Sequence, residues 1–414
     1  MTATEKLIYK TYQASFSLQS IPDAVIKKTL LQLAAEIEKS ISYLLKENKK
    51  DLSRQDKDNP KNDRLMLNGE RIRDISRSIV QISRLPNPAG KITEKRRLYN
   101  GLQLQKKSVP LGVIGAIYES RPNVTFDIAA LCLRSMNACV LKGSRDAEYS
   151  NKAAVAIIKK VLRANNIEPA CVSLLPAQRE AVHVLFTAEK YIDVIIPRGS
   201  NELIQYVRKN SLVPVIETGA GVCHVYVEKD ADINKAVRIA VNAKVSRPSV
   251  CNSLDSLLID KRIAPTFLRQ LMPEFEKYKV ELFADKNAWS LLGDYPYKHK
   301  AAAADFAREF LSLKCAVKVV DNYEEALKHI RTYSTRHSEA IVSKNKAVCE
   351  RFLREVDAAA VYSNASTRFT DGGEFGLGAE IGISTQKLHA RGPFALEKLT
   401  TEKWFIRGTG QIRN

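Results

Sequence analysis

The spacing of hydrophobic residues divides the chain into a helical beginning and an alternating remainder. Within residues 4–84, apolar residues recur three and four positions apart, most clearly over 30–44 and 72–82. This spacing gathers apolar side chains on one face of a helix, so it predicts amphipathic packing helices. The polar stretch 53–63, with its proline, asparagines and aspartates, predicts a loop between them.

From Leu102 onward, short apolar segments alternate with amphipathic segments. The apolar segments predict strands at 112–118, 138–141, 172–175, 192–196, 224–227, 254–259, 316–320 and 339–342. The segments between them predict helices from about Asp127, over 154–158, near Glu180, from Ser200, over 232–243 and over 324–330. Buried strands that alternate with helices indicate parallel, doubly wound α/β sheets, with a second α/β unit after Gly221.

The composition is that of a globular protein large enough to form two or three compact units. The chain has 414 residues, of which 45% are hydrophobic. No apolar run approaches the roughly 18 residues of a transmembrane helix, and the start lacks the order of a signal peptide. We therefore expect a cytoplasmic protein without membrane contact. The seven cysteines form no Cys-x-x-Cys pair, which predicts reduced thiols rather than disulfides or a zinc site.

The net charge is strongly positive, at +19. Such an excess suits either nucleic acid or small anionic ligands. Many of the basic residues lie in helix-like stretches, as at 46–51 and 91–97, where they decorate a solvated face. Because no basic stripe is interleaved with aromatic residues and no helix-turn-helix pattern occurs, we expect no nucleic-acid partner. A basic field would instead attract phosphorylated small molecules.

Cys251 is the most informative candidate for chemistry. Pro248 ends the preceding helix-like segment and predicts that Cys251 lies on an irregular connection, where a nucleophile can meet substrate. A cysteine attacks as its thiolate, which cations stabilise, and Lys244 and Arg247 lie close in the sequence. Glu217 is a second candidate, as a distant carboxylate. The alternative is that Cys251 is a buried structural thiol, because free cysteines are among the most buried residues.

Five segments carry a resemblance to a known family. They are 109–124, 196–204, 245–259, 337–341 and 364–385, and together they span most of the chain. In these segments the chain resembles the γ-glutamyl phosphate reductases, a family of the aldehyde dehydrogenase superfamily. The resemblance implies an α/β, aldehyde dehydrogenase-like fold of two doubly wound α/β domains with a small β oligomerisation flap.

The resemblance also implies an activity, the NADPH-dependent reduction of L-glutamate 5-phosphate to L-glutamate 5-semialdehyde and phosphate in proline biosynthesis. Cys251 would form a thioester, Asn123 would hold the oxyanion, and Glu217 would correspond to the general base. The alternative for Asn123 is that it caps the helix after Pro122, and both roles could hold at once. Glu217 could cap a turn instead, because a reductase has little need of activated water. Two other functions compete with this one. The first is the oxidation of a different semialdehyde, and the second is a nucleic-acid or scaffold role on an enzyme fold that has lost its activity.

The same resemblance implies how the chain is divided. Residues 1–222 would form the cofactor-binding domain, with a hairpin at about 97–112 that contributes to the flap. Residues 223–363 would form the domain of the catalytic cysteine, and residues 364–414 the return segment and oligomerisation tail. We therefore expect a homo-oligomer, and glutamate 5-kinase, which would make the unstable substrate, is a candidate partner.

The cofactor residues implied by the resemblance lie in three parts of the chain. They are Lys142 and Ser144 at the adenosine ribose, Arg198, Gly199 and Ser200 at the pyrophosphate, and Glu309 and Phe310 at the nicotinamide ribose. The segment 198–200 follows a predicted strand and opens a helix, where free N–H groups suit a phosphate, although a serine there is also an ordinary helix start. With Arg145 nearby, Lys142 could pair with a 2′-phosphate, which favours NADPH over NADH.

The remaining candidates concern the substrate and a metal. The residues implied to recognise the glutamyl head group and phosphate are Ser120, Arg121, Gly372 and Gly373. The Arg121 guanidinium could bind two carboxylate or phosphate oxygens at once, and the glycines let backbone N–H groups approach an anion. The alternative is that Arg121 forms a structural ion pair and that the glycines only turn the chain. Adjacent Cys223 and His224 would point to opposite faces of a strand and cannot chelate one ion, so no metal is expected.

Overall fold

The computed structural model describes residues 1–56 and 62–413, which form two compact units. Unit 1 comprises Met1–Thr218, Gly376–Gly382 and Phe394–Asn414, and unit 2 comprises Gly219–Phe375 and Ile383–Pro393. The main division falls after Thr218, slightly before the predicted boundary at 222. Residues 364–375, predicted as the start of the return segment, belong instead to unit 2.

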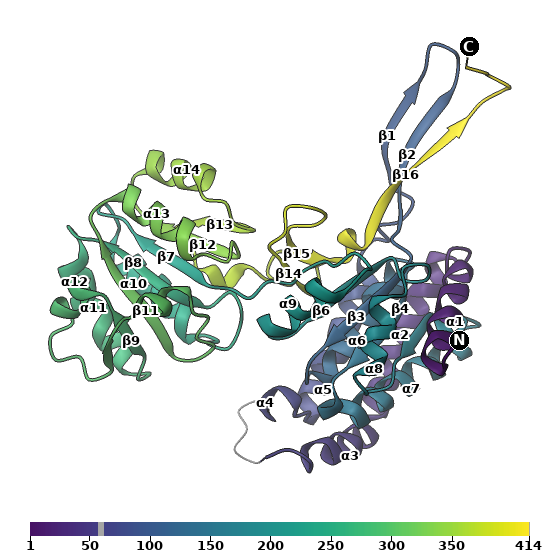
Figure 1. Ribbon diagram of the computed structural model, residues 1–414, viewed down its shortest axis with the longest axis horizontal. Helices are drawn as coiled ribbons and strands as arrows, with labels where there is room; N and C mark the ends of the chain where they lie inside the picture. Colours follow the sequence, from purple (N-terminus) through teal and green to yellow (C-terminus); the bar gives the residue numbers. More distant parts are fainter. Residues whose placement is uncertain (57–61, 414) are drawn as a thin grey trace. The chain divides into compact units, whose positions relative to one another are not determined.

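Unit 1 is built around a four-stranded parallel sheet (Figure 1). Its strands are β3 (Val113–Tyr118), β4 (Ala138–Gly143), β5 (Val172–Leu174) and β6 (Val194–Arg198), in the order β5-β4-β3-β6. The helices that follow them are α6 (Pro122–Arg134), α7 (Glu148–Ala164), α8 (Glu180–Phe186) and α9 (Asn201–Asn210). Every residue of β3 and β4 is buried, as is typical of parallel strands covered on both faces. The predicted alternation of strands and helices is confirmed.

The helices that precede this sheet are α1 (Ala3–Leu18), α2 (Asp23–Lys39), α3 (Ile41–Leu52), α4 (Asn62–Leu65) and α5 (Gly69–Arg84). The predicted apolar stripes are buried, as the isoleucines of α5 show. α5 packs against α2 on one side and α6 on the other, so these helices add a layer over the sheet's own helices. Of the loop predicted at 53–63, residues 57–61 lie outside the described residues, and α4 begins at Asn62.

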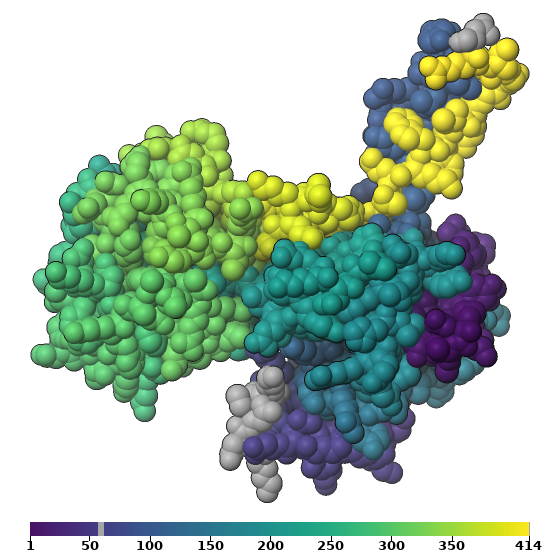
Figure 2. Space-filling model, in the orientation of Figure 1, coloured from purple at the N-terminus to yellow at the C-terminus, as the bar shows by residue number. Residues whose placement is uncertain are grey.

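An antiparallel sheet completes unit 1. Its strands are β1 (Ile92–Arg97), β2 (Gln103–Pro110) and β16 (Thr400–Arg407), in the order β1-β2-β16. Figure 2 shows the C-terminal strand, in yellow, against the blue hairpin. The predicted pairing of the tail with the hairpin is confirmed, although the hairpin begins at Ile92 rather than near 97. Most residues of β1 and β16 are exposed.

Unit 2 is built around a seven-stranded parallel sheet in the order β10-β9-β11-β8-β7-β12-β13. The strands are β7 (Cys223–Val227), β8 (Leu254–Asp260), β9 (Glu281–Ala284), β10 (Lys298–Lys300), β11 (Lys314–Val320), β12 (Ser338–Val342) and β13 (Ala360–Ser363). The helices are α10 (Ile233–Val245), α11 (Ala264–Glu276), α12 (Lys286–Leu291), α13 (Tyr323–Tyr333) and α14 (Lys346–Glu355). The sequence patterns predicted β7, β8, β11 and β12 but not β9, β10 or β13.

Alternate residues of the central strands of unit 2 face two separate cores. Val225 and Val227 pack with residues of α10, α11 and α12. Tyr226, between them, packs with residues of α13 and α14. Leu257 and Leu258 repeat this division on β8. Because side chains alternate across a strand, helices cover both faces of the sheet, which is the doubly wound arrangement that the sequence predicts.

The chain passes between the units near β14 (Glu380–Ser384) and β15 (Gly392–Ala395), which pair with each other. In residues 1–56 and 62–413, no helix is both long and apolar enough to cross a membrane. The same residues contain no group of three or more His, Cys, Asp or Glu side chains arranged to hold a metal ion.

Three histidines of unit 2 are buried. His224 on β7 pairs with Glu339 through Nδ1 at 2.9 Å, and its ring lies 5.5 Å from that of His329. His337, just before β12, accompanies Cys223 at the same end of the sheet. Burial lowers the pKa of His329 to about 3 and that of His337 to about 4. Both rings are therefore neutral at neutral pH, because a charged imidazole is poorly solvated there.

The pH dependence of unfolding follows from these two histidines. In the unfolded chain each titrates near 6.5, so the unfolded state binds more protons as the pH falls below that value. The stabilising contribution is complete above about pH 6.5 and is lost toward pH 4 and pH 3. We expect each histidine to remove about 2 kcal/mol of unfolding free energy between pH 7 and pH 5. Buried Asp255, whose pKa is raised to about 7, offsets part of this loss because it takes up a proton in the folded state over the same range. Urea unfolding of Trp404→Phe, followed by Trp289 fluorescence, measures this loss in unit 2.

Two variants separate the histidines from other titrating groups. His329→Gln should remove about 2 kcal/mol of the loss between pH 7 and pH 5. His183→Gln, which replaces an exposed histidine of unit 1, should leave the slope unchanged. An equal slope in the His329→Gln and wild-type proteins would show that burial does not suppress protonation of this ring.

Candidate active site

The candidate residues of unit 1 gather at one edge of its sheet. Glu119 and Ser120 directly follow β3, Ser144 follows β4, and Ser200 follows β6. Because these strands are parallel, their carboxyl ends meet at a single edge. The chain also reverses its direction across the sheet between β3 and β6, the place where open α/β sheets bind ligands.

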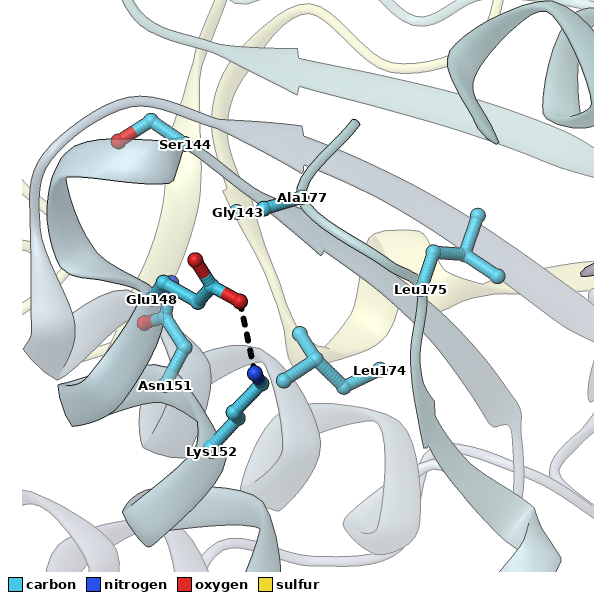
Figure 3. Close-up of a pocket in the computed structure, with 8 residues that line it drawn as sticks. All are labelled: Gly143, Ser144, Glu148, Asn151, Lys152, Leu174, Leu175 and Ala177. Atoms are coloured by element: carbon cyan, nitrogen blue, oxygen red, sulfur yellow. Dashed lines mark hydrogen bonds and ion pairs between the residues drawn. The ribbon is translucent and has the colours of Figure 1, made fainter. Parts of the chain in front are cut away.

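A small pocket opens beside the ends of β4 and β5. It is lined by Gly143, Ser144, Glu148, Asn151, Lys152, Leu174, Leu175 and Ala177 (Figure 3). Glu148 and Lys152 form an ion pair of 2.7 Å across one side. Gly143 has no room for a side chain, because an added Cβ would overlap the Asn151 amide. The pocket therefore offers charged and neutral polar groups of the kind that a ribose or its phosphate requires.

Lys142 lies next to this pocket but its side chain is buried. Its Nζ donates hydrogen bonds to the carbonyl oxygens of Gly143, at 3.0 Å, and Ala177, at 3.1 Å. Burial lowers the pKa of Lys142, with a smaller opposing effect from Glu148. The ammonium group thus holds the pocket wall in place, and it has a third N–H for a ligand oxygen.

The start of α9, predicted as the pyrophosphate site, is occupied by a carboxylate. Ser200 caps the helix by accepting from Leu203 N at 3.3 Å. Glu119 accepts from the N–H of Ser200 at 3.0 Å and from its hydroxyl at 2.8 Å. Gly199 is needed here, because an added Cβ would lie 2.7 Å from the Glu119 carboxyl carbon. A negative group does favour a helix N-terminus, as predicted, but in this structure Glu119 supplies it.

Arg198 and Ser120 make contacts that sequence patterns did not predict. Arg198 extends from β6 to donate to the carbonyl of Ile381, in the segment that returns to unit 1. Ser120 donates to Asp146 at 2.8 Å and lies 3.3 Å from the Ser144 hydroxyl. The structure therefore groups Ser120 with the cofactor candidates of unit 1, whereas Gly372 and Gly373 belong to unit 2.

Asn123 is the second residue of α6 and is not its N-cap. The N-cap position is taken by Arg121, which makes no side-chain cap, and Pro122 follows as the first helical residue. The Asn123 amide instead donates to Asp127, one turn on, at 3.0 Å. Burial raises the pKa of Asp127, and this hydrogen bond opposes the rise. The contact orients the amide and leaves its second N–H for another acceptor.

Glu217 lies in unit 1, half-buried, near the end of that unit's first segment. Its Oε1 is 3.6 Å from an Arg208 nitrogen on α9, so the carboxylate interacts with a cation. This contact joins the segment at Glu217 to α9.

Cys251 is the one cysteine of the seven that is not fully buried. It lies in the turn between α10 and β8, as the proline at 248 predicts. Gly221 packs directly on this turn: an added Cβ would overlap the Cys251 carbonyl oxygen and lie 2.6 Å from its carbonyl carbon. Cys223 also donates from its thiol to the same carbonyl at 3.2 Å. The Cys251 backbone is thus fixed from two sides, while its thiol is partly accessible.

Glu309 and Phe310 are part of the same neighbourhood in unit 2. Glu309 accepts from the Gly221 N–H at 3.1 Å, which joins it to the backbone that supports Cys251. Phe310 is buried, stacks near Phe283 at 5.2 Å between centroids, and donates from its N–H to Asp255 at 3.1 Å. These residues therefore belong to the unit that carries the thiol.

Lys244 is not available to Cys251, contrary to what its position in the sequence suggests. It is fully buried, and its Nζ contacts Asp255 Oδ1 at 3.4 Å and the Ser312 carbonyl at 3.1 Å. Burial raises the pKa of Asp255 to about 7, although the nearby Lys244 charge opposes this. A buried lysine that is held by such partners serves packing and the internal charge balance of unit 2.

A clamp that sequence reasoning missed holds the residue after the nucleophile. Asn252 donates from its amide to the carbonyl oxygens of Arg368, at 3.2 Å, and Thr370, at 3.0 Å. Its own carbonyl accepts from the Thr367 hydroxyl at 2.7 Å, and its side-chain oxygen accepts from Arg368. These bonds explain why 364–375 belongs to unit 2. The only signal in the sequence was the matching segment 364–385, which did not single out Arg368.

The glycine pair after this clamp forms a turn. Gly372 is buried and Gly373 is exposed. The Gly373 N–H donates to Asp371 Oδ1 at 2.8 Å. That N–H is therefore already satisfied within the chain, and the predicted use of Gly373 as an anion donor would require Asp371 to release it.

Comparisons with known proteins show the family to which the chain is similar. A model of the aldehyde dehydrogenase family matches residues 22–289. The γ-glutamyl phosphate reductase of Chlorobium phaeobacteroides is 52% identical over 99% of this chain and 98% of its own. The crystal structure of the γ-glutamyl phosphate reductase of Thermotoga maritima has a TM-score of 0.95 at 38% identity, over 100% of both chains. An engineered glycolyl-CoA reductase with bound NADP+, 15% identical over 98% of this chain and 97% of its own, shares the fold with a TM-score of 0.70.

Proposed function

Since the chain belongs to the γ-glutamyl phosphate reductases within the aldehyde dehydrogenase family, we propose that it reduces L-glutamate 5-phosphate to L-glutamate 5-semialdehyde and phosphate in proline biosynthesis. The observation that carries the proposal is Cys251, a partly exposed thiol on a rigidly supported turn. The other cysteines are buried and have no comparable access to a substrate. The electrophile would be the acyl carbon of the mixed anhydride.

Cys251 begins the reaction in this proposal. Its thiolate attacks the acyl carbon, the bond from that carbon to the phosphate oxygen breaks, and a thioester forms. The phosphate leaves with the bonding electrons and takes a proton from water. Asn123, whose amide is oriented by Asp127, donates its remaining N–H to the oxygen that becomes negative during the attack.

The residues of unit 1 fit a nicotinamide dinucleotide, which when bound would supply the hydride that converts the thioester into the aldehyde. The polar pocket beside Lys142 suits the adenosine ribose, and Lys142 with nearby Arg145 suits a 2′-phosphate, so we propose NADPH. Ser200 could receive the pyrophosphate once Glu119 withdraws from its N–H. Glu309, held by the Gly221 N–H, remains the candidate for the nicotinamide ribose, with Phe310 beside it.

Glu217 has no required step in the reductive direction. Activated water would destroy the thioester before reduction, so a reductase gains nothing from a base there. Its contact with Arg208 orients the carboxylate, which suits a role in ordering α9 near the cofactor residues. Arg121 remains the proposed guanidinium for the glutamyl head group, with Ser120 more closely tied to the cofactor residues.

We also propose a cytoplasmic homo-oligomer. β1 and β16 form the two edges of the antiparallel sheet of unit 1, and each pairs with β2 alone. Exposed strand edges readily pair with another chain, and Trp404 and Ile406 add exposed apolar surface there. Glutamate 5-kinase stays the proposed partner, because direct transfer would protect an unstable acyl phosphate.

The reverse reaction provides the test. With L-glutamate 5-semialdehyde and NADP+, we expect continuous NADPH formation only when phosphate is present, and slower formation with NAD+. Without phosphate, the reaction should stop after one NADPH per thiol, because the thioester has no acceptor. Continuous turnover without phosphate would identify a hydrolytic aldehyde dehydrogenase for a different semialdehyde, and salt-sensitive binding to a DNA duplex without any NADP+ reduction would favour a scaffold.

A further inference from the structure

Arg368 is fixed beside the nucleophile by contacts to both sides of the turn. Its Nε donates to the Ser246 hydroxyl, at the end of α10, at 3.0 Å. Another of its guanidinium nitrogens donates to the side-chain oxygen of Asn252, directly after Cys251. The guanidinium therefore spans the segment 246–252 that carries the thiol, and it is half-buried there.

A second arginine, Arg247, adds a positive charge close to Arg368. Burial lowers the pKa of Arg368, and the positive charge of Arg247 lowers it further, whereas Cys251, Asp371 and Glu374 act in the opposite sense. Arg247 is exposed, and within the described residues neither guanidinium forms an ion pair. Two like charges held close together are stabilised when an anion binds between them.

The end of α10 offers a simpler explanation for these cations. Helices end with partly negative carbonyl groups, which attract arginine and lysine. That effect would account for Arg247, close to Val245 where the helix ends. It does not account for Arg368, which comes from a distant segment and is oriented by Asn252 and by the clamp of Thr367 and Thr370.

We propose that Arg247 and Arg368 bind the phosphate group, as part of the acyl phosphate in the reductive direction and as free phosphate in the oxidative direction. This inference rests on the proposed function. A guanidinium offers two parallel N–H donors that match two phosphate oxygens. When Cys251 attacks, the bond from the acyl carbon to the phosphate oxygen breaks and its electrons stay with the phosphate. The arginines would stabilise the charge that accumulates there.

The experiment compares Arg247→Gln and Arg368→Lys with wild type in the oxidative direction. The first variant removes an exposed charge, and the second keeps the charge but loses the planar fork. We expect each to raise the KM for phosphate at least about tenfold, which is the usual effect of losing a charge-assisted hydrogen bond. For Arg247→Gln, the KM for the semialdehyde and the burst of NADPH formed without phosphate should stay within about twofold of wild type. Arg269→Gln, which replaces an exposed arginine of α11 in the same unit, is the matched control.

Phosphate protection gives a second measurement without turnover. Phosphate should slow alkylation of Cys251 by iodoacetamide in wild type and in Arg269→Gln, and it should protect neither active-site variant. An unchanged KM for phosphate in both variants would overturn the inference. A rise in the KM for the semialdehyde instead of the KM for phosphate would also overturn it, because the arginines would then bind the amino acid part of the substrate. Loss of the burst in a variant would assign that arginine to positioning the thiol and remove it from the phosphate site.

The two proposals fail in different ways. A wild-type enzyme that gives neither a burst nor phosphate-dependent turnover contradicts the proposed function itself. A wild-type enzyme that gives both, with variants that use phosphate normally, contradicts only the role of Arg247 and Arg368.

Discussion

Cys251→Ala is expected to lower the rate of phosphate-dependent NADP+ reduction by at least about 10⁴-fold. The thiolate forms the covalent bond of the reaction, and loss of a covalent nucleophile costs several orders of magnitude even when the binding groups remain. The burst of NADPH without phosphate should also disappear, because no thioester can form. Stopped-flow absorbance at 340 nm measures the burst and the turnover in one experiment.

Alkylation supports this prediction independently. Among the seven cysteines only Cys251 is partly exposed, so iodoacetamide should label wild type once per chain and Cys251→Ala not at all. Cys349→Ala, which replaces a buried thiol of α14, should keep turnover within about twofold and should still be labelled once. NADPH should bind Cys251→Ala as it binds wild type, because Lys142 and Ser200 belong to the other unit. Turnover within tenfold of wild type in Cys251→Ala would remove the cysteine from the mechanism.

The central strands and the position of the nucleophile were predictable from the sequence. β3, β4, β7 and β8 are buried along their length, so their apolar runs stand out against the amphipathic helices between them. The turn at Cys251 was predictable because proline cannot continue a helix and the strand after it is apolar. These features depend on local sequence alone.

The missed strands of unit 2 show the limit of that reasoning. β10 consists of Lys298, His299 and Lys300, and most of it is exposed at the sheet edge. β9 and β13 have four residues each and are only partly buried. Such strands exist because a neighbouring strand supplies their hydrogen bonds, and their own sequences carry little apolar pattern.

Side-chain partners were the least predictable part of the site. Lys244 precedes Cys251 closely in the sequence, yet its side chain turns to Asp255 inside the core. Arg368 lies far along the chain, yet it contacts Asn252. Glu119 reaches Ser200 because parallel strands bring their ends together. The position of a residue in the sequence does not determine where its side chain points. The order of the strands in the sheets brings these pairs into contact.

Met136 adopts a left-handed backbone, with φ of 63°. A methionine there is strained by the contact between its Cβ and the backbone. It follows α6 directly and precedes β4, so the sharp turn between them fixes the conformation in spite of the side chain.

Gly221→Ala is expected to lower turnover by about 100-fold or more while leaving unit 2 folded. The new methyl group would overlap the Cys251 carbonyl oxygen, so the turn that carries the thiol must move. A displacement of about 1 Å at a reacting group costs on the order of 10²-fold in rate. The same change would shift the Gly221 N–H away from Glu309 and so disturb the proposed nicotinamide contact as well.

Two measurements distinguish a displaced nucleophile from a damaged fold. Trp289 fluorescence and the urea midpoint of unit 2 should stay close to those of wild type, and iodoacetamide should still label Cys251, since a displaced thiol remains accessible. Gly69→Ala, at the open first position of α5, controls for the general effect of replacing glycine and should keep full activity. If Gly221→Ala retains turnover within about tenfold of wild type, the Cys251 turn must be able to move without misaligning the thiol and the substrate. The support from Gly221 and Cys223 would then not be what positions the thiol for attack.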